Sequence, residues 1–335
     1  MAGASERDRI VTYSPSYTLV ATHACFNRCT YCNFRVDLGQ DPGLDGATAG
    51  RQLAGLAAQG ISEVLILSGE VHPRHPGRPA WMERLVGLAQ LALEQDLLPH
   101  TNAGPLTWAE MGQLRQVNVS LGLMLEQVTP ALLTGVHRHA PSKRPDLRQQ
   151  QLDWAGRWRI PFTTGLLLGI GETPKDWVDT LDAIAHSHRR WGHIQEVILQ
   201  PYQPGHGQTA VLPPFPVDQL PEVVALARRL LPAEVVIQIP PNLIGRPDVL
   251  LACLEAGARD LGGIGLLDVI NPDYPQPAVR QLKALLATGG WVLQPRLPLY
   301  PIHDTWLPSH LQARVQGWRK TMLSRADLQT SLPIG

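Results

Sequence analysis

The sequence predicts an α/β fold, a (β/α)8 TIM-type barrel with a short N-terminal arm and a C-terminal extension. Short runs of apolar and β-branched residues alternate with longer segments of helical period along most of the 335 residues. Runs that are almost continuously apolar are typical of parallel strands covered on both faces. Eight such strand–helix units favour a closed barrel over an open sheet.

The strand candidates begin at residue 17 and end at residue 265, a span close to the ~250 residues typical of such a barrel. They are Tyr17–Thr22, Glu63–Ser68, Leu97–Thr101, Asn118–Leu125, Phe162–Leu168, Glu196–Gln200, Glu234–Ile239 and Asp260–Gly265. The helices expected between them include Ala47–Gln59, Trp81–Gln95, Asp146–Trp158, Trp177–Arg190 and Gln219–Leu231. The tail from about residue 266 shows no repeat, so we expect one domain over residues 1–335.

Composition and charge argue against two classes of partner. Lys and Arg number 29, as do Asp and Glu, so the formal net charge is zero and no broad basic face for nucleic acid is expected. No apolar run reaches the ~18–20 residues that span a membrane. Met1–Ile10 is charged and lacks the apolar segment of a secretory signal. We therefore expect a cytoplasmic protein with reduced thiols.

Three of the four cysteines lie within eight residues, in the spacing C-x3-C-x2-C. Thiolates at Cys25, Cys29 and Cys32 could hold three irons of a [4Fe–4S] cluster and leave the fourth iron open, as catalytic metal sites do. A zinc site with a distant fourth ligand, such as Cys253 or a histidine, is the alternative, although zinc sites favour C-x2-C pairs. Cys253 lies in an amphipathic helical pattern typical of a core residue.

The loop CFNRCTYC at residues 25–32, placed after the first predicted strand, resembles the cysteine loop of radical S-adenosylmethionine (SAM) enzymes. In that family SAM chelates the open iron, and one electron from the cluster cleaves it to a 5′-deoxyadenosyl radical. The radical then abstracts a hydrogen atom from the substrate. The resemblance implies a [4Fe–4S] cluster and SAM as cofactors, with Cys25, Cys29 and Cys32 as metal ligands at the catalytic centre.

The resemblance also implies a SAM site at the carboxyl ends of the strands. Ser68-Gly69-Glu70 is similar to the family segment that receives the SAM ammonium, and Gly169–Thr173 is similar to a segment beside the adenine. The implied SAM contacts are Tyr31 near the adenine, Ser68, Gly69, Glu70, Glu126 at the ribose hydroxyls, Arg148 at the SAM carboxylate, Gly169 and Glu172. Glu172 as a first-turn helix residue, Arg148 as a surface residue and Tyr31 as loop packing remain alternatives.

Longer segments give a finer resemblance. TYSPSYTLV (12–20), LSGEVHP (67–73), VHRHAPSKRPDLR (136–148), IPPNL (239–243) and DLGGI (260–264) resemble the cyclising, CofG-type subunits of 7,8-didemethyl-8-hydroxy-5-deazariboflavin (FO) synthase. This implies a radical SAM carbon–nitrogen lyase that converts the 5-amino-5-(4-hydroxybenzyl)-6-(D-ribitylimino)-5,6-dihydrouracil adduct to FO and ammonia. It also implies two partners, a second radical SAM subunit that supplies the adduct and a reductant such as ferredoxin or flavodoxin.

The substrate needs polar contacts at the barrel mouth, and His139 or His72 could assist proton loss during cyclisation. Nine polar residues at predicted strand ends or in adjoining loops are candidates for the pocket: His72, Asn102, Arg138, His139, Gln200, Tyr202, Asn242, Asp268 and Asn271. Three alternatives stay open. They are the partner-type transferase that joins a tyrosine-derived hydroxybenzyl group to the uracil, a non-catalytic Fe–S carrier, and a zinc-stabilised binding protein.

Overall fold

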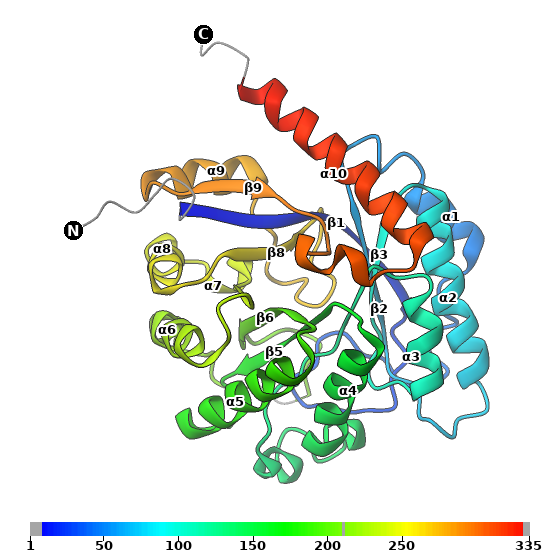
Figure 1. Ribbon diagram of the computed structural model, residues 1–335. Coiled ribbons are helices and arrows are strands. Elements are labelled where there is room, and N and C mark those ends of the chain that lie inside the picture. Colours follow the sequence, from blue (N-terminus) through cyan, green and yellow to red (C-terminus); the bar gives the residue numbers. More distant parts are fainter. Residues whose placement is uncertain (1–8, 210–211, 331–335) are drawn as a thin grey trace.

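Eight parallel strands form a closed barrel, because β1 (Ile10–Thr22) pairs with both β2 (Glu63–Ser68) and β8 (Asp260–Ile264) (Figure 1). The computed structural model describes residues 9–209 and 212–330, so most of the predicted N-terminal arm lies outside the described residues. Each of the other barrel strands pairs in parallel with its sequence neighbours. The predicted α/β barrel is therefore confirmed.

The helices alternate with the strands and surround them (Figure 1). The remaining barrel strands are β3 (Leu98–Asn102), β4 (Ser120–Gly122), β5 (Phe162–Leu168), β6 (Ile194–Pro201) and β7 (Val236–Gln238). The helices up to β8 are α1 (Gly46–Leu53), α2 (Arg78–Glu94), α3 (Trp108–Arg115), α4 (Pro145–Trp158), α5 (Pro174–Trp191), α6 (Leu220–Leu230), α7 (Pro241–Ile244) and α8 (Pro247–Ala256). No helix among residues 9–209 and 212–330 is long and apolar enough to cross a bilayer.

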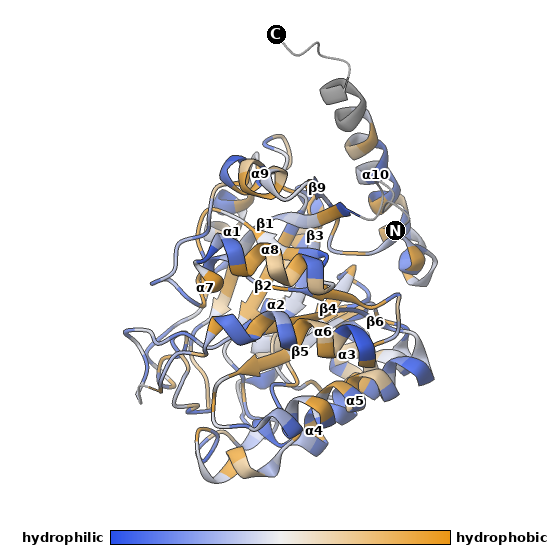
Figure 2. Cartoon of the chain, turned by 90° about the vertical axis from the view of Figure 1, so that its left-hand side faces the viewer, coloured by the Kyte–Doolittle hydropathy of each residue, from blue (hydrophilic) through white to orange (hydrophobic). Residues whose placement is uncertain are grey.

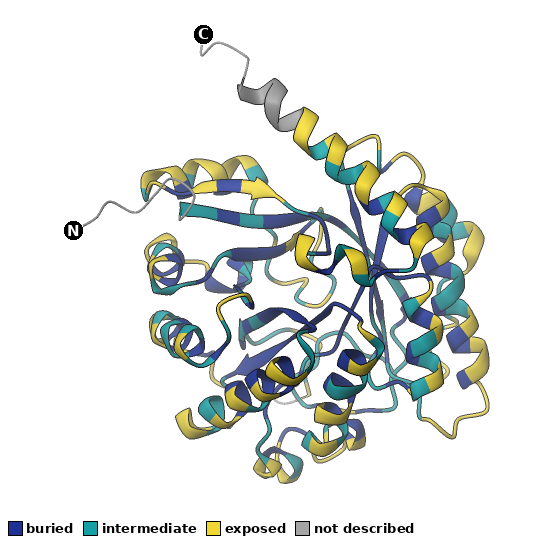
Figure 3. Cartoon of the chain, in the orientation of Figure 1, coloured by how far each residue is buried: buried dark blue, intermediate teal, exposed yellow. Residues whose placement is uncertain are grey.

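The strands supply the core and the helices cover it. All seven residues of β5 are buried, as expected of a strand covered on both faces. Figure 2 shows apolar residues concentrated on the strands, and Figure 3 shows exposed residues on the outward helix faces. Cys253 is fully buried on α8 within this core, so it packs as an apolar residue, as its helical pattern indicates.

Strand β1 begins seven residues earlier than the predicted Tyr17, since the structure starts it at Ile10. Pro15 made a continuous strand improbable from sequence, because proline cannot donate to a strand ladder. In the structure Pro15 lies where the neighbour of β1 changes from β9 (Val292–Pro295), which pairs with Ile10–Tyr13, to β2, which pairs from Ser16 onwards. A proline is tolerated at this junction between two ladders.

The tail after the barrel is more structured than its irregular sequence indicates. Helix α9 (Val279–Thr288) and β9 are followed by a 3-10 helix, η5 (Pro301–Trp306), and by α10 (Ser309–Thr330). Thr12 pairs with both β8 and β9, so these strands lie on opposite edges of β1. The predicted boundary near residue 266 stays a prediction, but the segment beyond it packs against the barrel.

This segment also closes the amino-terminal end of the barrel with a buried ionic cluster. Arg296 donates to Asp260 Oδ2 at 2.5 Å and to Glu196 Oε1 at 2.7 Å. Burial acts to raise the pKa of Asp260, but Arg296 outweighs it and lowers that pKa. Burial raises the pKa of Glu196 well above its ordinary value, so this carboxyl keeps its proton. Asp260 is therefore the charged partner of Arg296.

Replacing Arg296 by methionine should be strongly destabilising. Arg296→Met leaves the fully buried Asp260 without its cation, and we expect a loss of about 3–5 kcal/mol in the free energy of unfolding, measured by urea titration. The matched control is Arg314→Met, because Arg314 pairs with Asp96 on the surface, and it should cost less than about 1 kcal/mol. Equal losses in the two variants would contradict this account of the barrel floor.

Candidate active site at the carboxyl end of the barrel

The cysteine loop follows β1 and is fixed to the end of β2. The Phe26 amide donates to Glu70 O at 3.0 Å, and the Glu70 amide donates to Cys25 Sγ at 3.3 Å. Farther along the loop, the Cys32 amide donates to Cys29 O at 3.2 Å. These backbone contacts hold the three predicted metal ligands at one end of the barrel.

Gly69 allows the loop and β2 to approach this closely. A Cβ atom on Gly69 would lie 2.2 Å from the carbonyl oxygen of Ala24, a distance that no real side chain tolerates. The Gly69 amide donates to Thr22 O at 2.6 Å, which fixes the same junction. The sequence predicted a cofactor role for Gly69, and the structure gives it a steric one as well.

Glu70 and Arg148 form a buried ion pair beside the loop. Arg148 Nη2 donates to Glu70 Oε1 at 2.8 Å, and Asn27 Nδ2 donates to Glu70 Oε2 at 2.8 Å. Ser142 also donates to Glu70 Oε2. The side chain of Arg148 is only 2% exposed, so the surface alternative for this residue is wrong. Gly104 leaves the space that the Glu70 side chain fills.

A second buried pair joins Glu126 and Lys143, with 2.5 Å between Lys143 Nζ and Glu126 Oε1. Burial alone would raise the pKa of Glu126, but Lys143 and Arg148 outweigh it and lower that pKa below its ordinary value. The Glu126 backbone has a φ of 62°, which costs a non-glycine residue on the order of 1 kcal/mol. Strain of this kind is commonly found at functional sites.

Tyr31 and His137 form a neutral pair next to these charges. The atoms Tyr31 Oη and His137 Nε2 are 2.9 Å apart. Burial raises the pKa of Tyr31 well above its usual value and lowers the pKa of His137 to about 3. Both side chains are therefore neutral, and one hydrogen bond joins the tyrosine hydroxyl to the imidazole at Nε2. Lys143 Nζ lies 6.0 Å from the centre of the Tyr31 ring.

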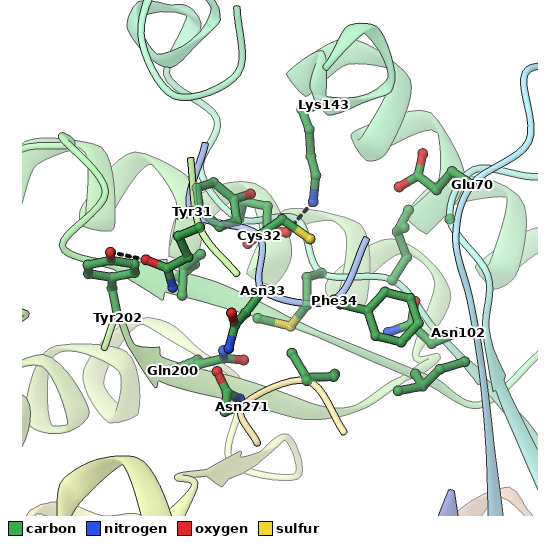
Figure 4. A pocket seen from close by; sticks show the side chains of 18 of the residues that line it. Tyr31, Cys32, Asn33, Phe34, Glu70, Asn102, Lys143, Gln200, Tyr202 and Asn271 are labelled. Atoms are coloured by element: carbon green, nitrogen blue, oxygen red, sulfur yellow. Dashed lines mark hydrogen bonds and ion pairs between the residues drawn. The ribbon is translucent and has the colours of Figure 1, made fainter. Parts of the chain in front are cut away.

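Tyr31, Glu70, Glu126, Lys143 and Arg148 line a cavity of about 960 Å³, named here the cluster cavity (Figure 4). In the view of Figure 4, Lys143 and Glu70 lie above the space, and Gln200 and Asn271 lie below it. Apolar wall is supplied by Phe34, Leu67, Leu123, Met124 and Leu167. The cavity also includes nine of the predicted cofactor and substrate contacts and the predicted metal ligand Cys32; the nine are Tyr31, Ser68, Glu70, Glu126, Arg148, Asn102, Gln200, Tyr202 and Asn271.

Several predicted residues lie elsewhere. Glu172 accepts from the amides of Gly169 at 2.6 Å and Ile170 at 2.8 Å and from Trp177 Nε1, so it stabilises the turn after β5. Neither Glu172 nor Gly169 lines the cluster cavity. Glu172 therefore has a structural role in fixing the end of β5, and the adenine contact of this segment stays a prediction.

The two histidines expected as bases are also outside the cavity. His72 Nδ1 accepts from the Arg74 amide at 3.1 Å, and its ring packs edge-on against Phe26. His139 is exposed, like Arg138, and its carbonyl accepts from the Arg28 amide at 2.7 Å. None of the three lines the cluster cavity. The position of these loops gives no support to His72 or His139 as a general base, and that role stays a prediction.

Sequence reasoning missed Lys143, His137 and Asn27. Lys143 and His137 lie within the segment 136–148 that carried the family resemblance, so the signal was present but not assigned to side chains. Asn27 lies between two cysteines, where it is 3% exposed and binds Glu70. An uncharged residue inside a metal-binding loop gives no sequence signal of its own.

The donor set fits an iron–sulfur cluster better than a single ion. In a cubane each thiolate binds a different iron, so the three sulfurs surround a shared space and do not converge on one point. Among the residues that the structure describes, no three His, Cys, Asp or Glu side chains converge on one ion. The closed set of converging ligands that a structural zinc site would show is thus not found among the described residues. Cys25, Cys29 and Cys32 are all free thiols.

Comparisons with known proteins agree with this geometry. The radical SAM superfamily matches residues 19–184. The chain is 62% identical over 309 residues to the 7,8-didemethyl-8-hydroxy-5-deazariboflavin synthase of Thermosynechococcus vestitus, covering 92% of this chain and 98% of that protein. The chain belongs to the FO synthase family of radical SAM enzymes. A relative from Trichormus variabilis with the same name is 57% identical and covers 94% of this chain and 92% of its own.

Two solved structures share the fold at low sequence identity. The [FeFe]-hydrogenase maturase HydG is 13% identical with a TM-score of 0.73, covering 93% of this chain and 71% of that chain. Methylornithine synthase (PylB) is 16% identical with a TM-score of 0.66, covering 86% of this chain and 84% of that chain. These likenesses support the barrel alone. Membership of the FO synthase family, by contrast, implies a 4Fe–4S cluster and SAM as cofactors.

Substitution of Gly69 tests the contact between the loop and β2. In Gly69→Ala the new Cβ would collide with Ala24 O, so we expect a loss of about 1–3 kcal/mol in stability and less iron bound per chain. Iron and sulfide are measured after anaerobic reconstitution. Gly50→Ala is the control, because the space around Gly50 is open and alanine favours its helix. Full iron loading of Gly69→Ala would show that this contact does not position the ligands.

Proposed function

We propose that this protein catalyses the cyclising step of FO synthesis, as a radical SAM carbon–nitrogen lyase. The substrate is the hydroxybenzyl–ribityl-uracil adduct, and the products are FO and ammonia. The observation that carries the proposal is a single cavity with cofactor residues on one side and carboxamide side chains on the other. The name shared by relatives 62% and 57% identical to this chain supports the reaction.

Cys25, Cys29 and Cys32 would hold three irons of the cluster. When bound, the cluster and SAM together supply the one-electron chemistry that removes a hydrogen atom from the substrate. The protein contributes binding and orientation, and the apolar wall residues Phe34, Leu67 and Met124 exclude water. Because thiolates hold such a cluster only when reduced, we place the reaction in the cytoplasm.

Arg148 and Glu70 would bind the amino-acid part of SAM. Arg148 donates through Nε to Ser142 O, through Nη1 to Met124 O and through Nη2 to Glu70 Oε1. A guanidinium has five N–H donors, so two remain for a carboxylate. Glu126 would accept from the ribose hydroxyls. Its Oε1 is bound by Lys143, and none of the described residues donates to its Oε2.

In this proposal other proteins supply the adduct and the electron. A second radical SAM subunit would supply the adduct, and ferredoxin or flavodoxin would supply the electron. The alternative, in which this chain itself joins tyrosine-derived hydroxybenzyl to the uracil, predicts consumption of tyrosine. Product analysis separates the two reactions.

Arg148→Met should weaken SAM binding roughly 10- to 100-fold, since a charge-assisted hydrogen bond to the SAM carboxylate is lost. Calorimetry with the reconstituted protein measures the affinity, and iron content shows whether the site remains intact. Arg144→Met is the control, because Arg144 lies on the surface and pairs with Asp146. Unchanged SAM affinity in a cluster-loaded Arg148→Met variant would remove Arg148 from the SAM site.

Anaerobic turnover tests the reaction itself. The reconstituted protein is supplied with SAM, reductant and the adduct, and mass spectrometry and fluorescence detect 5′-deoxyadenosine and FO. We expect both products. Formation of 5′-deoxyadenosine without FO would support radical SAM chemistry but contradict the proposed substrate. Consumption of tyrosine would establish the transferase alternative.

A further inference from the structure

A second cavity of about 1180 Å³, named here the lumen, continues from the cluster cavity into the barrel. The two cavities share six lining residues, Leu67, Asn102, Met124, Gln200, Ile270 and Asn271. The lumen reaches the ionic cluster at the floor, where Glu196 and Arg296 line it. A molecule bound against the cofactor residues can therefore extend down the barrel axis.

The lumen walls are polar where barrels of this type are usually packed with branched apolar side chains. Ser16, Thr18, Gly122, Thr163 and Gly263 occupy inward positions on four strands, β1, β4, β5 and β8. These residues are small, so they leave the interior hollow. A hollow interior lacks the van der Waals contacts of a packed core, and a bound ligand would supply those contacts.

Several carboxamides face this space without a protein partner. Within the described residues, the side-chain amides of Asn102, Gln200 and Gln238 make no hydrogen bond, and all three line the lumen. Gln276 Oε1, also in the lumen lining, is buried and without a partner. An unpaired buried polar atom such as Gln276 Oε1 costs free energy, and the partly buried amides of Asn102, Gln200 and Gln238 are available to a ligand in the lumen.

Asn242 is the most sharply oriented of these groups. Its Nδ2 donates to Asp268 Oδ2 at 2.9 Å and to Tyr274 O at 3.0 Å, which fixes the direction of the amide. Its Oδ1 is buried and has no hydrogen-bond partner. Asn242 therefore presents a fixed acceptor in the wall of the lumen.

The chemistry of the two cavities differs along the axis. A carboxamide offers one donor and one acceptor side, which matches the alternating N–H and C=O groups of a uracil edge and the hydroxyls of a polyol. The positive charge of Arg296 is balanced by Asp260, so a ligand that reaches the floor of the lumen needs no charge of its own. The cluster cavity instead offers Phe34, Leu123 and Tyr202, which suit an aromatic ring.

We propose that the lumen holds the uracil and ribityl part of the substrate, with Gln200, Gln238 and Asn242 as specificity-determining contacts. The inference rests on the proposed function and deepens it. The hydroxybenzyl ring then lies toward the cluster cavity. The length and polarity of the lumen select for the polyol.

The test compares binding of two ligands to the cluster-loaded protein by calorimetry. One is the adduct, and the other is the same adduct with a methyl group in place of ribityl. Gln200→Met and Gln238→Met keep side-chain length and remove the amide, which has no protein partner to lose. We expect each variant to bind the full adduct roughly three- to tenfold more weakly. Gln90→Met, on the exposed face of α2, is the matched control.

Three readouts separate the outcomes. Wild-type protein should prefer the ribityl adduct, Gln238→Met should lose much of that preference, and SAM affinity should stay unchanged in each variant. If wild-type protein makes FO but both variants bind the two ligands as wild type does, the lumen proposal is overturned and the proposed function stands. If wild-type protein neither binds the adduct nor makes FO, the proposed function fails and the lumen proposal fails with it.

Discussion

The buried ion pair between Glu70 and Arg148 is the interaction on which the rest of the site depends. Glu70 ends the segment after β2 and binds the cysteine loop through Asn27. Arg148 comes from α4 and binds the carbonyl of Met124, beyond β4. One ion pair thus joins three strand–helix units that are far apart in sequence. It therefore adds a side-chain link between the metal-binding loop and the wall of the cluster cavity to the backbone hydrogen bonds that hold the loop on β2.

A buried pair of this kind is costly to desolvate, and it stabilises a fold only when its remaining hydrogen bonds are made. Here Asn27 and Ser142 satisfy the carboxylate, and backbone carbonyls satisfy much of the guanidinium. The Glu126–Lys143 pair lies beside it and is also buried, but it leaves Glu126 Oε2 without a donor among the described residues. The site is thereby held in place before any cofactor binds, which is the condition for orienting a reactive intermediate without reorganisation.

Much of the fold could be predicted from sequence, because buried parallel strands such as β5 read as apolar runs. The cysteine spacing indicated an iron–sulfur cluster because all three ligands lie within eight consecutive residues. Features that depend on distant partners could not be predicted. β1 runs through Pro15 because its neighbour changes there, and the placement of the loops that carry His72 and His139 outside the cluster cavity could not be foreseen. Lys143 lay in a segment that carried the resemblance, but its role could not be assigned because it depends on Glu126, 17 positions away.

The order of these elements along the chain separates cofactor chemistry from substrate choice. The radical SAM match ends at residue 184, after β5, and it contains every side chain assigned here to the cluster or SAM. Most of the unpartnered carboxamides in the lumen come later, from β6, β7 and α7, and the floor is closed by Arg296 from the tail. Because a barrel brings all strand ends to one rim, the later strands can change without moving the earlier ones. The second half of the chain can therefore set substrate specificity while the first half keeps the cofactor chemistry of the superfamily.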